Sequence, residues 1–137
     1  MQKNTIEGIL LGLGCIIWGL LYFCFLKFFP YSLYDIMDIT TIRNYSQTEL
    51  DSLKDMLLLI RNIIEIIAII LIILICGGMI ILYKHSKHNI RDGSLVSYST
   101  IITFVGTVAH IVGAHGISWA IIEIAGIIIL LNTFKNN

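Results

Sequence analysis

Four long runs of apolar residues occupy most of this 137-residue chain. They cover about residues 8–29, 57–83, 95–114 and 118–134, and each is close to the roughly 20 helical residues that cross the apolar core of a bilayer. Because an unpaired backbone amide or carbonyl is costly in lipid, such runs cross as helices. The sequence therefore predicts an all-α membrane protein, a four-transmembrane-helix bundle that forms a single domain over residues 1–137.

Composition supports the membrane prediction and excludes several classes of function. Hydrophobic residues make up 57% of the chain and charged residues 13%, and the mean hydropathy is +0.88, which leaves too little polar surface for a soluble domain of this size. The formal net charge is zero, so no basic footprint points to nucleic acid. Since no nucleotide-binding, protease or hydrolase motif is present, we expect no catalytic residue and no enzyme.

One long polar stretch, residues 31–56, separates the first two apolar runs. Ser46 and Glu49 match a capping box, and leucines and isoleucines then recur at helical spacing. The second helix is therefore predicted to begin near Ser46, outside the membrane, and to enter the bilayer around Leu57. The stretch is acidic, and its charged residues are Asp35, Asp38, Glu49, Asp51 and Asp55 against Arg43 and Lys54.

Lysine and arginine are distributed unequally between the two predicted membrane faces. Arg43 and Lys54 lie on the face of the long polar stretch, with Lys27 and Arg61 near its boundary. The positive-inside rule therefore predicts a cell-membrane protein with both termini in the cytoplasm and the 31–56 segment outside. Five basic residues mark the predicted cytoplasmic face: Lys3, Lys84, Lys87, Arg91 and Lys135.

Small residues are spaced so that they share one face of a helix. Close backbone approach drives helix association in lipid, so such faces are expected to receive a neighbouring helix. Packing within one chain is the favoured interpretation, and self-association through the 8–29 helix is the alternative. The stripe of the 8–29 helix is Gly8, Gly12, Cys15 and Gly19, and that of the 95–114 helix is Ser99, Thr103, Gly106, His110 and Gly113.

Ionisable residues inside the apolar runs form a candidate site. Glu65, His110 and Glu123 lie at similar depth in three helices, Arg61 precedes Glu65 by one turn, and His115 lies in the turn that follows the 95–114 helix. Charged groups at such depth are expected to face inward and to find one another. They form a hydrogen-bond network that fixes helix register, a ligand or proton site open to the outside, or a metal site. The first interpretation is favoured, and because no HExxH or comparable ligand spacing is present, no metal or cofactor is predicted.

Two Gly-containing segments resemble those of a known group. Residues 7–14 (EGILLGLG) and 121–131 (IIEIAGIIILL) are similar to the corresponding parts of small uncharacterised bacterial four-span membrane proteins. The resemblance implies a four-helix bundle with a basic turn after the second helix, a tight hairpin between the last two helices, and no settled activity. Small multidrug transporters carry a carboxylate in the middle of their first helix, whereas here Glu7 lies at its edge, which argues against that family.

These features predict a non-enzymatic multi-pass membrane protein that binds a partner through its external face. Besides the lipid bilayer, the expected partner is another membrane protein, a secreted peptide against which the chain gives immunity, or a second copy of the chain. The alternative prediction is a small transporter or channel subunit that uses Glu65, His110 and Glu123.

Overall fold

The computed structural model describes residues 3–86 and 90–135, and every regular element in these ranges is helical. The short 3-10 helix η1 and the short helix α2 lie between two long helices near the start of the chain. In chain order the elements are α1 (Lys3–Phe28), η1 (Leu33–Asp35), α2 (Ile39–Arg43), α3 (Gln47–Ser86), α4 (Ile90–Ile111) and α5 (His115–Lys135). The prediction of an all-helical chain is confirmed for the described residues.

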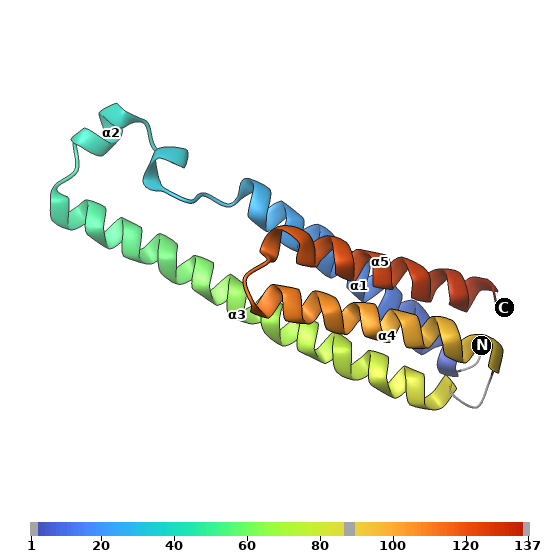
Figure 1. Ribbon diagram of the computed structural model, residues 1–137. Helices are drawn as coiled ribbons and strands as arrows, with labels where there is room; N and C mark the ends of the chain where they lie inside the picture. Colours follow the sequence, from blue (N-terminus) through green and yellow to red (C-terminus); the bar gives the residue numbers. More distant parts are fainter. Residues whose placement is uncertain (1–2, 87–89, 136–137) are drawn as a thin grey trace.

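The four long helices lie side by side as an antiparallel bundle (Figure 1). The beginning of α1, the end of α3, the beginning of α4 and the end of α5 are at one end, and the α4–α5 turn is nearer the other (Figure 1). Helix α5 packs extensively against both α1 and α4, while α3 packs against α4 and, over a smaller area, against α1. The last helix is therefore the one that holds the bundle together.

Length and composition make three of these helices suitable for crossing a membrane. They are Thr5–Phe28, Gln47–His85 and His115–Lys135, and α4 contains the shorter apolar segment Leu95–Ile111. Because apolar side chains cover much of the outside of the bundle, three apolar helices of this length indicate a membrane location.

Helix α3 extends well beyond the other helices (Figure 1). It contains 40 residues and is therefore about 60 Å long at about 1.5 Å per residue. The predicted capping box is confirmed, since the Glu49 amide donates to Ser46 Oγ (3.2 Å) and the Ser46 amide donates to Glu49 Oε2 (3.3 Å). We call residues 31–56, with η1, α2 and the first turns of α3, the arm.

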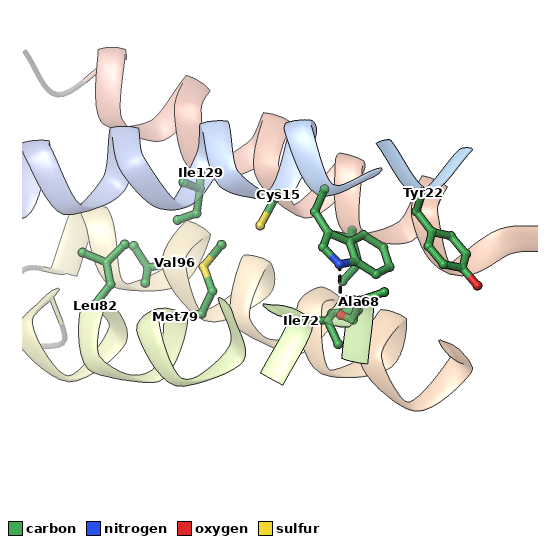
Figure 2. Packing of buried hydrophobic residues seen from close by; sticks show 10 residues of the cluster. Cys15, Tyr22, Ala68, Ile72, Met79, Leu82, Val96 and Ile129 are labelled. Carbon is green, nitrogen blue, oxygen red and sulfur yellow. Dashed lines mark hydrogen bonds between the residues drawn. The ribbon is translucent and has the colours of Figure 1, made fainter. Parts of the chain in front are cut away.

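The interior combines apolar side chains with polar groups that are satisfied locally. Cys15, Ile72, Met79 and Ile129 point into the space between the helices (Figure 2). Threonines of α4 donate to carbonyls one turn earlier on their own helix, which satisfies these hydroxyls locally. The hydroxyls of Thr100, Thr103 and Thr107 donate to the carbonyls of Val96, Ser99 and Thr103 at 2.7–2.8 Å.

The glycine stripe of α1 faces α5. A Cβ added at Gly8 or Gly19 would overlap side chains of α5, and one added at Gly12 would lie 2.5 Å from Leu130 Cγ. Cys15 lies in the same contact, where its Cβ would be 2.7 Å from a Cβ added at Gly126 of α5. This stripe is therefore occupied by a helix of the same chain, which leaves it unavailable for the alternative of self-association.

The two glycines predicted to pack in α4 have different roles. A Cβ added at Gly106 would lie 2.7 Å from Ile122 Cδ1, so this glycine admits α5 closely. Gly113 has nothing within 4 Å of such a Cβ and adopts φ +97°, so its prediction as a packing residue is wrong. It lies in the turn that ends α4, where the left-handed conformation favours glycine.

That turn also shifts the helix ends from their predicted positions. Helix α4 ends at Ile111, and the Ala114 amide donates to the Ala109 carbonyl (2.8 Å) as the chain reverses. Helix α5 begins at His115, before the predicted start at residue 118, so Ser118 lies inside the helix and is fully buried.

Candidate functional site

The polar residues that cluster in the structure come from all four long helices. Trp18 and Tyr22 lie one turn apart on α1, with their rings stacked at a centroid distance of 5.2 Å. Glu65 comes from α3, His110 from the last turn of α4, and His115 from the start of α5. We call Tyr22, Glu65, His110 and His115, together with Ser118, the histidine cluster.

Glu65 is held toward the bundle interior by α1. The Tyr22 hydroxyl lies 2.9 Å from Glu65 Oε1 and 2.8 Å from Oε2, so it donates to this carboxylate. His110 Nε2 lies 3.7 Å from Glu65 Oε2, and the His110 ring packs edge-on against Tyr22 with a centroid distance of 4.8 Å. The carboxylate therefore joins helices α1, α3 and α4 through one group.

His110 is enclosed, and both of its ring nitrogens face polar groups. Nδ1 lies 3.2 Å from Ser118 Oγ and 3.3 Å from His115 Nδ1. Two N–H groups cannot point at one another, so at most one of the two facing Nδ1 atoms carries a proton. The His110 side chain is 0% exposed, and its Nε2 has no hydrogen-bond partner among the described residues.

The turn between α4 and α5 brings His110 and His115 together, although they are only five residues apart in the sequence. Five residues would place them on different faces of a continuous helix, but α4 and α5 are separate helices joined by the Gly113 turn. The two imidazole rings consequently lie 4.5 Å apart between centroids. The turn brings the second histidine back over the first.

Arg61 is directed away from Glu65. Its guanidinium lies 3.7 Å from the centroid of the Tyr31 ring and 5.5 Å from that of Phe25, in cation–π geometry. The two residues are one helical turn apart, but no ion pair within 4.0 Å joins them among residues 3–86 and 90–135. The expected one-turn pair is therefore not formed, because the carboxylate turns inward and the guanidinium turns toward the aromatic rings.

Glu123 lies outside the histidine cluster. It packs against Gly19 of α1, and its buried Oε1 has no hydrogen-bond partner in the described part of the chain. The structure thus brings Glu65, His110 and His115 together, with ligand atoms no more than 4.8 Å apart, and leaves Glu123 aside.

Sequence reasoning missed the contributions of Trp18, Tyr22 and Ser118. The Trp18 indole donates to the Ala68 carbonyl (3.1 Å), and this bond is visible in Figure 2. Trp18 and Tyr22 continue the helical spacing of Cys15, which is the available signal that they face inward. Tyr22 also lies near the end of the first apolar run, where aromatic residues are typical of a membrane interface, so the signal is ambiguous.

A second candidate surface lies at the base of the arm. The chain after α1 folds back over the projecting part of α3 and encloses a pocket of about 360 Å³. Both apolar and charged side chains line this pocket, including Tyr31, Leu33, Ile42, Lys54, Leu57 and Arg61.

The predicted basic face is described only in part. Lys84 and Lys135 belong to the end of the bundle that holds both termini, where His85 Nδ1 also lies 3.4 Å from Glu7 Oε2. Lys87 and the side chains of Lys3 and Arg91 lie outside the described residues.

No protein-family model, curated protein or solved structure matches this chain. The resemblance to small four-span bacterial membrane proteins therefore stays a prediction. What the chain does has to be argued from its own geometry.

Proposed function

We propose that this chain is a non-enzymatic multi-pass membrane protein that binds a partner protein through the arm. The observation that carries the proposal is apolar exposure outside the bundle. Tyr34 is 68% exposed and Met56 56%, and Tyr31, Ile36 and Ile39 are also exposed. Lipid explains such exposure along the bundle but not on the arm, where apolar patches are typical of interaction sites.

The length of α3 supports placing the arm outside the membrane. The bundle helices α1, α4 and α5 have 26, 22 and 21 residues, enough to cross an apolar core about 30 Å thick. Helix α3 has 40 residues, so about half of it exceeds that thickness. Its first turns contain Glu49, Asp51, Lys54 and Asp55, which suit water rather than lipid.

We infer four membrane crossings, with α4 as the third. Helix α4 is about 33 Å long at about 1.5 Å per residue, which matches the bilayer core. An even number of crossings places both termini on one face. This agrees with the structure, in which the beginning of α1 and the end of α5 lie at the same end of the bundle (Figure 1). The basic residues of that face support a cytoplasmic location in a cell membrane under the positive-inside rule, and the proposed topology therefore has the arm outside.

The net charge of the arm indicates which kind of partner would be complementary to it. The arm carries five carboxylates and two basic side chains, a formal net charge of −3. A complementary partner presents basic and apolar groups together, as a cationic amphipathic peptide or a basic loop of another membrane protein does. The pocket at the base of the arm is large enough to receive an anchoring side chain of that partner.

Photocrosslinking in intact cells tests the proposal. A crosslinking amino acid at Tyr34 or Ile39 is expected to capture one protein or peptide that the same group at Leu131, an exposed residue of α5, does not capture. The double substitution Asp51→Lys and Asp55→Lys should reduce capture more than the matched Asn pair. Equal adducts at all positions, or capture that is insensitive to charge, would contradict it.

A small transporter or channel subunit is the second candidate function. It is favoured by two groups able to carry protons, Glu65 and His110, that lie 3.7 Å apart in the bundle. Glu123 no longer belongs to this path, because it lies apart from them. Flux through proteoliposomes that Glu65→Gln abolishes would support the candidate, whereas a loss of stability alone would assign the cluster to folding.

A further inference from the structure

We propose that Glu65, His110 and His115 bind one zinc ion. Each residue comes from a different helix and offers one ligand atom, and these atoms lie no more than 4.8 Å from one another. Two imidazole nitrogens and one carboxylate oxygen form a donor set that suits zinc, with a fourth position left for water or another ligand. Calcium and magnesium prefer sites made of oxygen atoms alone, so this set disfavours them.

The separation of the two histidines matches tetrahedral coordination. Their Nδ1 atoms are 3.3 Å apart. At a zinc–nitrogen distance of about 2.0–2.1 Å, two ligands of a tetrahedral ion are separated by about 3.4 Å. A cation between the rings could be bound by both facing nitrogens when neither carries a proton. Without the cation, two unprotonated nitrogens that face each other make no favourable contact.

The carboxylate needs only a small movement to complete the site. The largest separation of ligand atoms, 4.8 Å, exceeds the tetrahedral edge by about 1.4 Å, within the reach of a rotation of the Glu65 side chain. The Tyr22 hydroxyl contacts both carboxylate oxygens and holds them at the site. Since Glu65 has two oxygens, one is able to reach the ion while the other still accepts from Tyr22.

The unpartnered nitrogen of His110 is a second, independent observation. The side chain is fully buried and its Nε2 has no hydrogen-bond partner among the described residues, which is costly. The polar group nearest to this nitrogen is the carboxylate that we propose as the third ligand, with Glu65 Oε2 3.7 Å from Nε2. A buried polar atom without a partner commonly marks a place for an ion or a water, which supports a ligand site beside Glu65.

The surroundings favour entry of a cation. The positive charge of Arg61 is turned onto the Tyr31 ring and away from Glu65. Glu65 and His115 are half-buried while His110 is buried, so an ion would reach the first two before it meets the third. Binding would connect α3, α4 and α5 at the end of the bundle from which the arm projects (Figure 1).

Zinc titration of the purified full-length protein tests the proposal. The chain is freed of metal with a chelator, dialysed against buffered zinc and analysed for bound metal. We expect one zinc per chain, and at least a tenfold loss of affinity in His115→Ala and in Glu65→Gln. His85→Ala and Glu123→Gln are matched controls, because they remove a histidine and a carboxylate outside the cluster, and they should change affinity less than threefold.

Cobalt provides a second readout that distinguishes this site from adventitious binding. Tetrahedral coordination by nitrogen and oxygen gives cobalt(II) intense visible bands, which should appear in wild type and His85→Ala and be lost in His115→Ala. His115 is half-buried at a turn, so this variant is a safer test than one at His110. The proposal is overturned if wild type binds no stoichiometric zinc, if His115→Ala binds as wild type does, or if His85→Ala weakens binding equally.

Discussion

Each end of the bundle joins a histidine to a glutamate across two helices, yet the two pairs differ in burial. His85 of α3 lies 3.4 Å from Glu7 of α1, with side chains 44% and 25% exposed. His110 of α4 lies 3.7 Å from Glu65 of α3, with side chains 0% and 24% exposed. The two glutamates are thus similarly exposed, and the pairs differ at the histidine: His85 is open to its surroundings, while His110 is enclosed by Tyr22, His115 and Ser118.

The difference shows that residue type alone does not define a site. Exposed ion pairs contribute little because water or headgroups solvate both partners equally well when the pair is broken. Enclosed polar groups have no such replacement, so each must find a partner within the protein or pay a desolvation cost. The pair that contains the buried His110 is therefore expected to respond strongly to substitution and to metal, and the exposed pair weakly to both.

The largest effect we predict is stabilisation by zinc. At a free zinc concentration 100 times the dissociation constant, a site present only in the folded state stabilises by about 2.7 kcal/mol. The unfolding midpoint of wild type and of His85→Ala should rise with zinc, and that of His115→Ala should not. An equal rise of the unfolding midpoint in His115→Ala would show that zinc binds elsewhere, and the two ends of the bundle would then not differ in their response to metal.

Substitution of the carboxylate beside His110 should have the next largest effect. Glu65→Ala leaves the Tyr22 hydroxyl without its acceptor and removes the group nearest His110 Nε2, which predicts a loss of about 1–3 kcal/mol. Glu7→Ala is the matched variant at the exposed end. Unfolding in detergent, followed by circular dichroism, measures both, and equal losses would show that burial does not separate the two pairs.

Removal of the Tyr22 hydroxyl tests how much α1 contributes to the stability of the histidine cluster. Tyr22→Phe deletes the hydrogen bonds to Glu65 and keeps the stacked ring, so we expect a loss of about 0.6 kcal/mol and no more than about 1.7 kcal/mol, the range of hydrogen bonds within membrane bundles. Tyr98→Phe is the control, since Tyr98 is exposed. A neutral Tyr22→Phe in the same unfolding assay would remove α1 from the histidine cluster.

The smallest effect is expected at the exposed end. His85→Ala should change the free energy of unfolding by less than about 0.5 kcal/mol, as is usual for surface pairs. The same assay measures this value. A loss comparable to that of Glu65→Ala would mean that the cytoplasmic end of the proposed topology is far less exposed than the geometry indicates.

Much of the fold could be predicted because the signals are local. Ser46 and Glu49 mark the start of α3 through a capping box that involves only neighbouring residues. The glycine stripe from Gly8 to Gly19 identified a face that receives a helix, although it did not identify α5 as that helix. The end of α4 was less predictable, because the left-handed Gly113 resembles a packing glycine in the sequence.

Only part of the candidate site could be predicted, because most of its contacts are not local in the sequence. Glu65 and His110 were expected to converge because buried charge seeks a partner, and they lie 3.7 Å apart. Glu123 was expected to join them, but α5 packs closely onto α1, and Glu123 lies against Gly19 instead. Tyr22, the closest partner of Glu65, was not predicted, because its choice depends on how α1 is rotated about its own axis.

By itself the sequence determined the helical fold, the apolar lengths that indicate a membrane, and the polar, acidic character of the arm. These properties depend on composition and on spacing within one segment, where partners are at most a few turns apart. The tertiary structure alone decided that His115 meets His110, that Tyr22 holds Glu65 and that Arg61 turns to Tyr31. These contacts join residues up to 43 positions apart, so helix rotation and turn geometry fix them together.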